Sequence, residues 1–231
     1  MERPMRQVTF FCGLFVMAGC PDHQLGRFNA SPEVVVTSHA SSIDALEGYQ
    51  YTFRAQVSDP DDPTSELTVT WRYLDDIVCA PEAPTADGTH ECDITIVETS
   101  GNITVEVVDP DLAGDSAFIE ITTIPTAAPT GVILGPTPTG KYYSSHKVAF
   151  QAQLADAEDT LTLLRGAWTS DLDGALSMAS EPDASGTLTG ASYLSEGQHY
   201  IELKVTDSTG KQGTDSVVVD VGPPNTPPTC S

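Results

Sequence analysis

The chain has 231 residues, of which 33 are acidic and 10 basic, so its formal net charge is −23 at pH 7. A nucleic-acid-binding surface needs lysine and arginine to neutralise phosphates, and this charge argues against such a partner. Hydrophobic residues make up 39% of the chain, and long runs rich in valine, isoleucine and threonine indicate folded β-structure rather than an acidic disordered chain. The length suits one large domain or two ordinary ones.

The N-terminus has the pattern of an export signal. Arg3 and Arg6 form a positive start, and the mostly apolar stretch over residues 8–17 is too short to cross a bilayer. It ends in Met17-Ala18-Gly19-Cys20, which resembles the bacterial lipobox, in which the cysteine is lipidated and becomes the first mature residue. An ordinary signal peptide with an incidental cysteine is the alternative.

This resemblance implies a lipid-anchored protein without a transmembrane helix. The signal peptide is predicted to cover residues 1–19, and a lipidated tether is predicted over residues 20–31. Pro21 follows the cysteine where inner-membrane retention in enteric bacteria uses aspartate. By that analogy, we expect the protein at the bacterial outer membrane or the cell surface.

Export would place the mature chain in an oxidising compartment, where cysteines pair. Of the five cysteines, Cys12 leaves with the signal and Cys20 takes the lipid. Cys79 and Cys92, separated by twelve residues, are predicted to form a disulfide. They form no CxxC unit and have no second ligand pair beside them, which disfavours zinc. Cys230 is left over.

The central part of the chain contains an internal sequence repeat of two copies. The segment FRAQVSDPDD over residues 53–62 recurs as FQAQLADAED over residues 150–159, at a spacing of 97. Trp71 and Trp168 keep that spacing. Repetition on this scale predicts two copies of one domain, which we place at residues 32–125 and 126–222.

Each copy has the pattern of short antiparallel strands. Apolar residues alternate with polar ones over residues 49–57, 103–107 and 201–205, and Gly, Pro and Asp separate the runs. No segment has a convincing helical stripe. About seven strands per copy, with a lone tryptophan on the third, predict an all-β fold of two tandem immunoglobulin-like antiparallel β-sandwiches.

The second copy carries the sequence features of a known group of domains. It contains Phe150-x-Ala-x-Leu-x-Asp156, then Trp168-Thr-Ser-Asp171, and Gly197-x-His199-x-Ile-x-Leu-x-Val-x-Asp207. These motifs resemble the Ig-like repeats, close to PKD and cadherin-like domains, that occur in tandem on bacterial surface lipoproteins. The resemblance covers roughly residues 30–222 and implies fold and location, but almost nothing about activity.

The tail over residues 223–231 is rich in proline and has the composition of a stiff linker. Its Pro228-Thr229 also resembles Pro129-Thr130, at the start of the second copy. The tail therefore has the appearance of the start of a third repeat.

Acidic residues supply the candidate binding site. Strands over residues 49–58, 67–74 and 102–108 would bring the loops that follow the first and third of them to one pole of the sandwich. Clustered carboxylates at a domain joint suit Ca²⁺, which cadherin-like proteins use for stiffening. The other interpretation is that these residues shape local turns. The candidates are Asp59, Asp61, Asp62, Asp109 and Asp111 in the first copy, and Asp156, Glu158, Asp159 and Asp207 in the second.

Motifs of enzymes, such as GxSxG and HExxH, are absent from the sequence. His199 is interpreted as a structural hydrogen-bonding residue, and the two tryptophans as core residues. We therefore expect a non-enzymatic, membrane-anchored surface lipoprotein for adhesion, spacing or assembly, with a protein or glycan partner. The alternative is the stalk of a larger enzyme or receptor. Carbohydrate binding by Tyr142, Tyr143 and Tyr193 is a weaker hypothesis, because the sequence does not group these aromatics.

Overall fold

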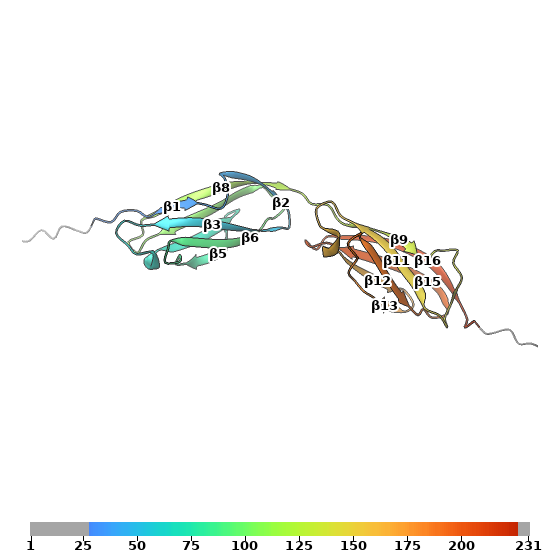
Figure 1. Ribbon diagram of the computed structural model, residues 1–231. Coiled ribbons are helices and arrows are strands. Elements are labelled where there is room, and N and C mark those ends of the chain that lie inside the picture. The colour runs from blue at the N-terminus through green and yellow to red at the C-terminus, as the bar shows by residue number, and fades with distance from the viewer. Residues whose placement is uncertain (1–27, 226–231) are drawn as a thin grey trace, which may run out of the picture.

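The computed structural model describes residues 28–225, which form two β-sandwiches joined end to end (Figure 1). The predicted signal peptide, most of the predicted tether with Cys20, Cys230 and the Pro228-Thr229 motif lie outside the described residues. Within residues 28–225, no helix is long and apolar enough to cross a membrane.

Domain 1 has a three-stranded sheet in the order β1-β3-β6 and a five-stranded sheet in the order β2-β8-β7-β4-β5. One short 3₁₀ helix, η1 (Thr64–Glu66), connects β3 to β4. The strands are β1 (Glu33–Val36), β2 (Ser42–Leu46), β3 (Gln50–Ser58), β4 (Thr68–Tyr73), β5 (Asp76–Glu82), β6 (Thr89–Thr95), β7 (Gly101–Val108) and β8 (Gly114–Ile124).

Domain 2 repeats this topology strand for strand, with sheets in the orders β14-β11-β9 and β10-β16-β15-β12-β13. The 3₁₀ helix η2 (Leu161–Leu163) occupies the place of η1. The prediction of two tandem immunoglobulin-like sandwiches is confirmed. The strands are β9 (Thr130–Gly135), β10 (Tyr142–Tyr143), β11 (Val148–Ala155), β12 (Arg165–Ser170), β13 (Gly174–Leu176), β14 (Thr187–Ser192), β15 (Gly197–Thr206) and β16 (Gln212–Gly222).

Each sandwich departs from a purely antiparallel arrangement at one edge. The chain of domain 1 begins in the small sheet, where β1 pairs with β3, and then crosses to the large sheet, where β2 runs parallel to β8. Domain 2 does the same with β9 and β10, and β10 runs parallel to β16. Alternation along a strand reports which side chains are buried and not which neighbour the strand pairs with, so the sequence did not predict this crossing.

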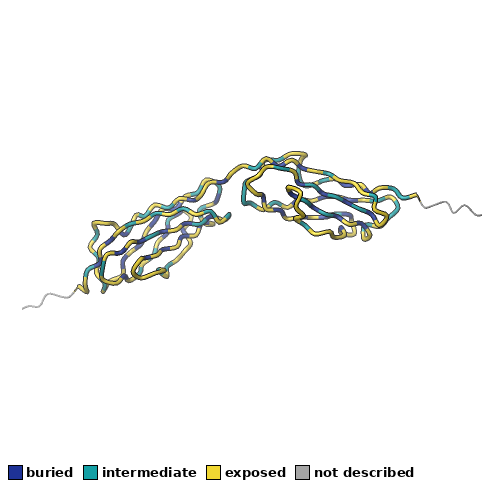
Figure 2. Tube along the Cα trace, turned by 180° about the vertical axis from the view of Figure 1, so that it is seen from behind, coloured by how far each residue is buried: buried dark blue, intermediate teal, exposed yellow. Residues whose placement is uncertain are grey.

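The inward-facing residues of both sheets make one core per domain, and the buried positions lie inside two separate bodies (Figure 2). In domain 1, Phe53 of β3 and Trp71 of β4 face each other across the sheets with ring centroids 6.4 Å apart. In domain 2, Phe150 and Trp168 pack at 5.1 Å. All four side chains are almost fully buried, and each such burial contributes about 2 kcal/mol to stability. Both tryptophans are core residues, as predicted.

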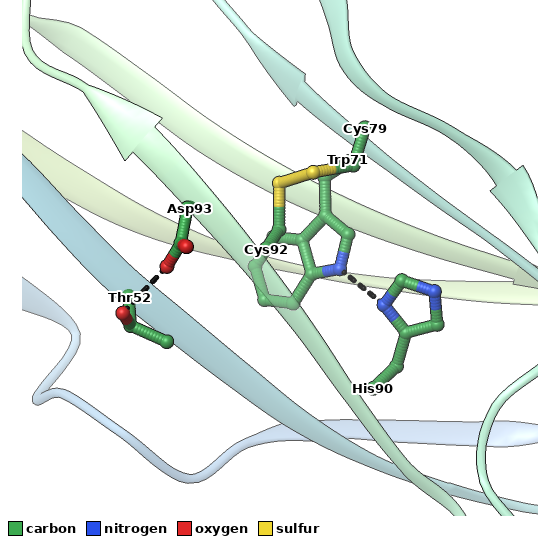
Figure 3. Close-up of a disulfide and its surroundings, with 6 residues drawn as sticks. All are labelled: Thr52, Trp71, Cys79, His90, Cys92 and Asp93. Atoms are coloured by element: carbon green, nitrogen blue, oxygen red, sulfur yellow. Dashed lines mark hydrogen bonds between the residues drawn. A yellow bond between two sulfur atoms is a disulfide. The ribbon is translucent and has the colours of Figure 1, made fainter.

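Domain 1 has a disulfide that domain 2 has no cysteines to form. Cys79 of β5 and Cys92 of β6 are bonded, as predicted, and their Cα atoms lie 6.1 Å apart. β5 and β6 are edge strands of opposite sheets, so the bond ties the two layers together at one open side. Figure 3 shows it beside Trp71, whose indole N–H donates to Nδ1 of His90 at 3.0 Å.

We predict that the double substitution Cys79→Ala/Cys92→Ala lowers the free energy of unfolding of domain 1 by about 3 kcal/mol, because the unfolded chain regains the entropy of a closed loop. Urea unfolding followed by tryptophan fluorescence measures this. Each domain contains one tryptophan, so a Trp168→Phe background lets Trp71 report domain 1 alone. An unchanged unfolding midpoint for domain 1 in that background would contradict the prediction.

Candidate functional site

The candidate site is the joint between the domains, where three segments meet around the linker at residues 125–129. Domain 1 contributes the tight turn between β2 and β3, at residues 47–49. Domain 2 contributes the β11–η2 loop and the β15–β16 loop. Gly48 has φ of 81°, and a Cβ at this residue would lie 2.8 Å from Cβ of Thr209 in domain 2. Glycine therefore serves both the turn and the close approach of the two domains.

A tyrosine–carboxylate hydrogen bond crosses the joint. The hydroxyl of Tyr49 donates to Oδ1 of Asp159 at 2.5 Å. Ser208 donates to the same carboxylate through its backbone N–H at 2.7 Å and its hydroxyl at 2.8 Å. The bond to Asp159, together with burial, raises the pKa of Tyr49 to about 12. Burial raises the pKa of Asp159, but the hydrogen bonds from Tyr49 and Ser208 outweigh it and hold that pKa below its ordinary value.

An ion pair crosses the joint beside this bond. Nζ of Lys211 in domain 2 donates to Oε2 of Glu47 in domain 1 at 2.8 Å, and to the carbonyl of Thr126 in the linker at 2.6 Å. One ammonium group thus holds both domains and the linker. Its hydrogen bond lowers the pKa of Glu47.

The acidic loops of domain 2 shape their own turns as well as the joint. Oδ1 of Asp156 accepts the backbone N–H groups of Glu158 at 2.9 Å and of Asp159 at 2.7 Å. Oδ1 of Asp207 accepts those of Thr209 and Lys211. These contacts are the predicted turn chemistry.

The linker takes part directly, because its Ala127 N–H donates to Oε2 of Glu158 at 3.2 Å. Direct contacts between protein groups thus connect the two domains and the linker.

The tip of domain 1, where the loops after β3 and β7 lie, repeats the same turn. Oδ1 of Asp59 accepts the N–H groups of Asp61 at 2.8 Å and Asp62 at 2.9 Å. Asp109 accepts the N–H of Ala113 at 2.8 Å and the side-chain amide of Asn29 at 2.7 Å.

In the described part of the chain, one group of three acidic side chains has a metal-ligand arrangement: oxygens of Asp59, Asp62 and Asp109 all lie within 4.8 Å of one another. Asp111 is exposed and lies outside that group. Ca²⁺ takes six to eight oxygens, so the backbone or water would have to complete such a site. Calcium binding stays a prediction.

Sequence reasoning missed the partners that domain 1 supplies to the joint. Glu47 and Tyr49 lie in a turn whose distance from the acidic loops of domain 2 cannot be read from spacing. One feature of the sequence could have pointed to Lys211. It is the only basic residue in the loop at residues 207–211, in a chain with few basic residues. His199 is as predicted: it is fully buried, with Nδ1 2.8 Å from Oγ of Ser170 and Nε2 2.9 Å from the carbonyl of Ser195.

Comparisons with known proteins concern the fold alone. No protein-family model matches the chain, and no curated protein matches it. Among solved structures, the chain is similar to the fibronectin(III)-like modules of Clostridium thermocellum CbhA, with 19% identity, 83% of this chain and 95% of that chain covered, and a TM-score of 0.41.

Two further solved structures have similar values. A chimeric titin tandem is 15% identical, with 83% and 98% covered and a TM-score of 0.36. The N-terminal Ig1-2 module of the Drosophila receptor protein tyrosine phosphatase DLAR is 16% identical, with 83% and 99% covered and a TM-score of 0.30. At these identities and scores, none of the three indicates what this chain binds.

We predict that Tyr49→Phe loosens the joint while leaving each domain folded. The variant loses a hydrogen bond to a carboxylate, which is worth about 2 kcal/mol. NMR relaxation should show the two domains tumbling more independently than in the wild type. Tyr193→Phe, which removes an exposed hydroxyl far from the joint, is the matched control and should change nothing.

The same measurement has an expected pH dependence. The pKa of Asp159 is lowered, so its contribution is complete above the ordinary aspartate pKa of about 3.9 and is lost as pH falls further. The pKa of Tyr49 is raised, so its contribution is complete below about 10 and is lost as pH rises towards about 12. Coupled tumbling that is identical in Tyr49→Phe and the wild type would contradict this account of the joint.

Calcium binding is tested by calorimetry on the soluble Cys20→Ser chain at about 1 mM Ca²⁺. Binding at the tip of domain 1 should release or absorb heat, raise the melting temperature, and disappear in Asp109→Asn. Asp207→Asn, the counterpart in domain 2, should leave binding at the tip intact. If the wild-type loops give no heat and no shift in melting temperature, the carboxylates serve turns alone.

Proposed function

We propose that this protein is an exported, lipid-anchored surface protein whose two sandwiches form a stiff, non-enzymatic spacer for adhesion or assembly. The observation that carries the proposal is the bonded joint. Tyr49 and Glu47 of domain 1 hold Asp159 and Lys211 of domain 2 at 2.5 and 2.8 Å, and Lys211 also holds the linker.

The arrangement of the chain supports a spacer. The described chain enters at the tip of domain 1 and leaves at the far end of domain 2, so the domains follow one another end to end between the two ends (Figure 1). An anchor at Cys20 would hold the tip of domain 1 near the membrane. The far end of domain 2 would then be carried outward by the length of both sandwiches.

The buried imidazoles support the non-enzymatic part of the proposal. His199 contacts hydrogen-bonding partners at both ring nitrogens. Burial lowers the pKa of His90, whose Nδ1 accepts the indole N–H of Trp71. Both residues are thereby committed to structural hydrogen bonds. The stalk of a larger enzyme or receptor is the alternative, and it would use the same stiffness to carry a different domain.

The anchor is tested by replacing Cys20. We predict that Cys20→Ser releases the protein from membranes into the soluble fraction, because the thiol that carries the lipid is gone. Cys12→Ser is the matched control and should remain with membranes, since Cys12 is predicted to leave with the signal. Immunoblotting of soluble and membrane fractions measures both variants. If Cys20→Ser stays in the membrane fraction, the lipoprotein proposal is wrong.

A further inference from the structure

The two domains close the same open side of the sandwich in different ways. In domain 1, the disulfide between Cys79 of β5 and Cys92 of β6 bonds the edge strands of opposite sheets (Figure 3). In domain 2, β13 and β14 are the corresponding edge strands, and neither contains a cysteine. Another group therefore closes this side of domain 2.

Strand register identifies the residues that replace the two cysteines. In each domain, one of the two positions lies opposite the core tryptophan and the other lies opposite the core phenylalanine. These residues are Cys79 and Cys92 in domain 1, opposite Trp71 and Phe53, and Leu176 and Gly190 in domain 2, opposite Trp168 and Phe150. A leucine and a residue without a side chain thus stand where domain 1 has its disulfide.

Met178 fills the space that Gly190 leaves. A Cβ at Gly190 would lie 2.7 Å from Sδ of Met178, 3.0 Å from its Cβ and 3.1 Å from its Cγ. The Met178 side chain thus lies directly against the backbone of β14, in the small sheet. It also packs against the buried core of domain 2. The flexible thioether of methionine is suited to filling such a gap.

The segment that carries Met178 runs along the edge of the large sheet. β13 ends at Leu176, and further along the segment the carbonyl of Ser180 accepts the N–H of Gly166 in β12 at 2.8 Å. Met178 therefore reaches from one sheet to the other, as the disulfide does in domain 1. In domain 2 this closure is made by packing instead of a covalent bond.

The position of Met178 leaves its thioether open to oxidation, because the side chain is only partly buried. A peroxide oxidises a thioether to a sulfoxide. The sulfur lone pair attacks one oxygen of hydrogen peroxide, the O–O bond breaks and an S–O bond forms. The leaving hydroxide takes the proton of the transferred hydroxyl group and departs as water. The sulfur thereby loses two electrons, and the peroxide gains them.

The sulfoxide does not suit the surroundings of Met178. It places a polar oxygen against the apolar core of domain 2, where the thioether made apolar contacts. It is also larger than the thioether, which already lies close to the backbone at Gly190. We therefore expect oxidation to loosen the packing between the two sheets at this side.

Met178 is the only methionine in the two sandwiches. The other three, Met1, Met5 and Met17, lie in the predicted signal peptide. Domain 1 has no methionine, and the sulfur atoms at its corresponding position are already joined as a disulfide. The same oxidant should therefore act on domain 2 and spare domain 1.

From these observations we propose that Met178 is an oxidation site through which peroxides lower the stability of domain 2 alone. The change is reversible, because methionine sulfoxide reductases convert the sulfoxide back to the thioether. The site uses neither the proposed lipid anchor nor the contacts of the joint, so its test stands apart from that of the proposed function.

The experiment uses the full chain carrying Cys20→Ser in a Trp71→Phe background, in which Trp168 reports domain 2 alone. Hydrogen peroxide is added to the folded protein, and peptide mass spectrometry measures the sulfoxide at Met178. Urea unfolding is then followed by Trp168 fluorescence. At a fixed urea concentration within the transition, the ratio of folded to unfolded domain 2 should fall about tenfold after oxidation. Reductases for the two sulfoxide epimers, supplied with a thiol reductant, should restore the ratio.

Met178→Leu is the matched variant, because leucine has a similar volume and its side chain has no sulfur to oxidise. Domain 2 of this variant should unfold at the same urea concentration before and after peroxide treatment. In the Trp168→Phe background, Trp71 should report no change in domain 1.

The proposal is wrong if peroxide leaves Met178 unoxidised in the folded protein, or if its full oxidation leaves the unfolding of domain 2 unchanged. It is also wrong if peroxide destabilises domain 2 of Met178→Leu as much as that of the wild type. If Met178→Leu does not fold, the reductases decide: recovery of the wild-type ratio supports the site, and no recovery contradicts it.

Discussion

One carboxylate directly after the third strand of each copy, β3 or β11, shapes the pole on which the rest of the molecule depends. Asp59 and Asp156 each accept two backbone N–H groups from the residues that follow. A turn closed in this way needs no other element to support it. It holds the next acids, such as Asp159, at the rim of the sandwich, where another domain can contact them. The local turn is thus what makes contact between domains possible.

The joint shows how little is needed to hold two sandwiches in line. Tyr49, Glu47 and Lys211 form the bonds across it, and Gly48 lets the backbone come close enough for them to form. The carboxylate of Asp159 is partly desolvated and accepts three hydrogen bonds. Hydrogen bonds to a charged group are stronger than bonds between neutral groups. A few bonds at a short linker therefore restrict the motion of the two domains relative to each other far more than the linker composition alone would.

The two copies have kept their topology and changed their end faces. Strand order, the parallel edge pair and the aspartate turn are the same in both. The end faces differ in charge: Ala113 occupies the loop position of Lys211, and Gln50 occupies the repeat position of Lys147. Core positions are constrained by packing, whereas an end face is constrained only by what it meets. Such differences are consistent with faces that meet different neighbours.

Alternation of apolar residues and the repeat at 97 positions were enough to predict two sandwiches and their core tryptophans, since both follow from local pattern. The disulfide between Cys79 and Cys92 was predicted from the export signal, which implies an oxidising compartment and sets Cys12 and Cys20 aside. The turn role of Asp59 and Asp156 was likewise predictable, because its partners lie two and three residues away. The joint was not. Tyr49 meets Asp159 across 110 residues and Glu47 meets Lys211 across 164, and such pairs depend on which end of each sandwich the linker brings together. The excess of acidic over basic residues was therefore visible in the composition. Only the tertiary structure decided which carboxylates join the domains and which face outward, because a carboxylate is neutralised by groups near it in space and not by its neighbours in the sequence.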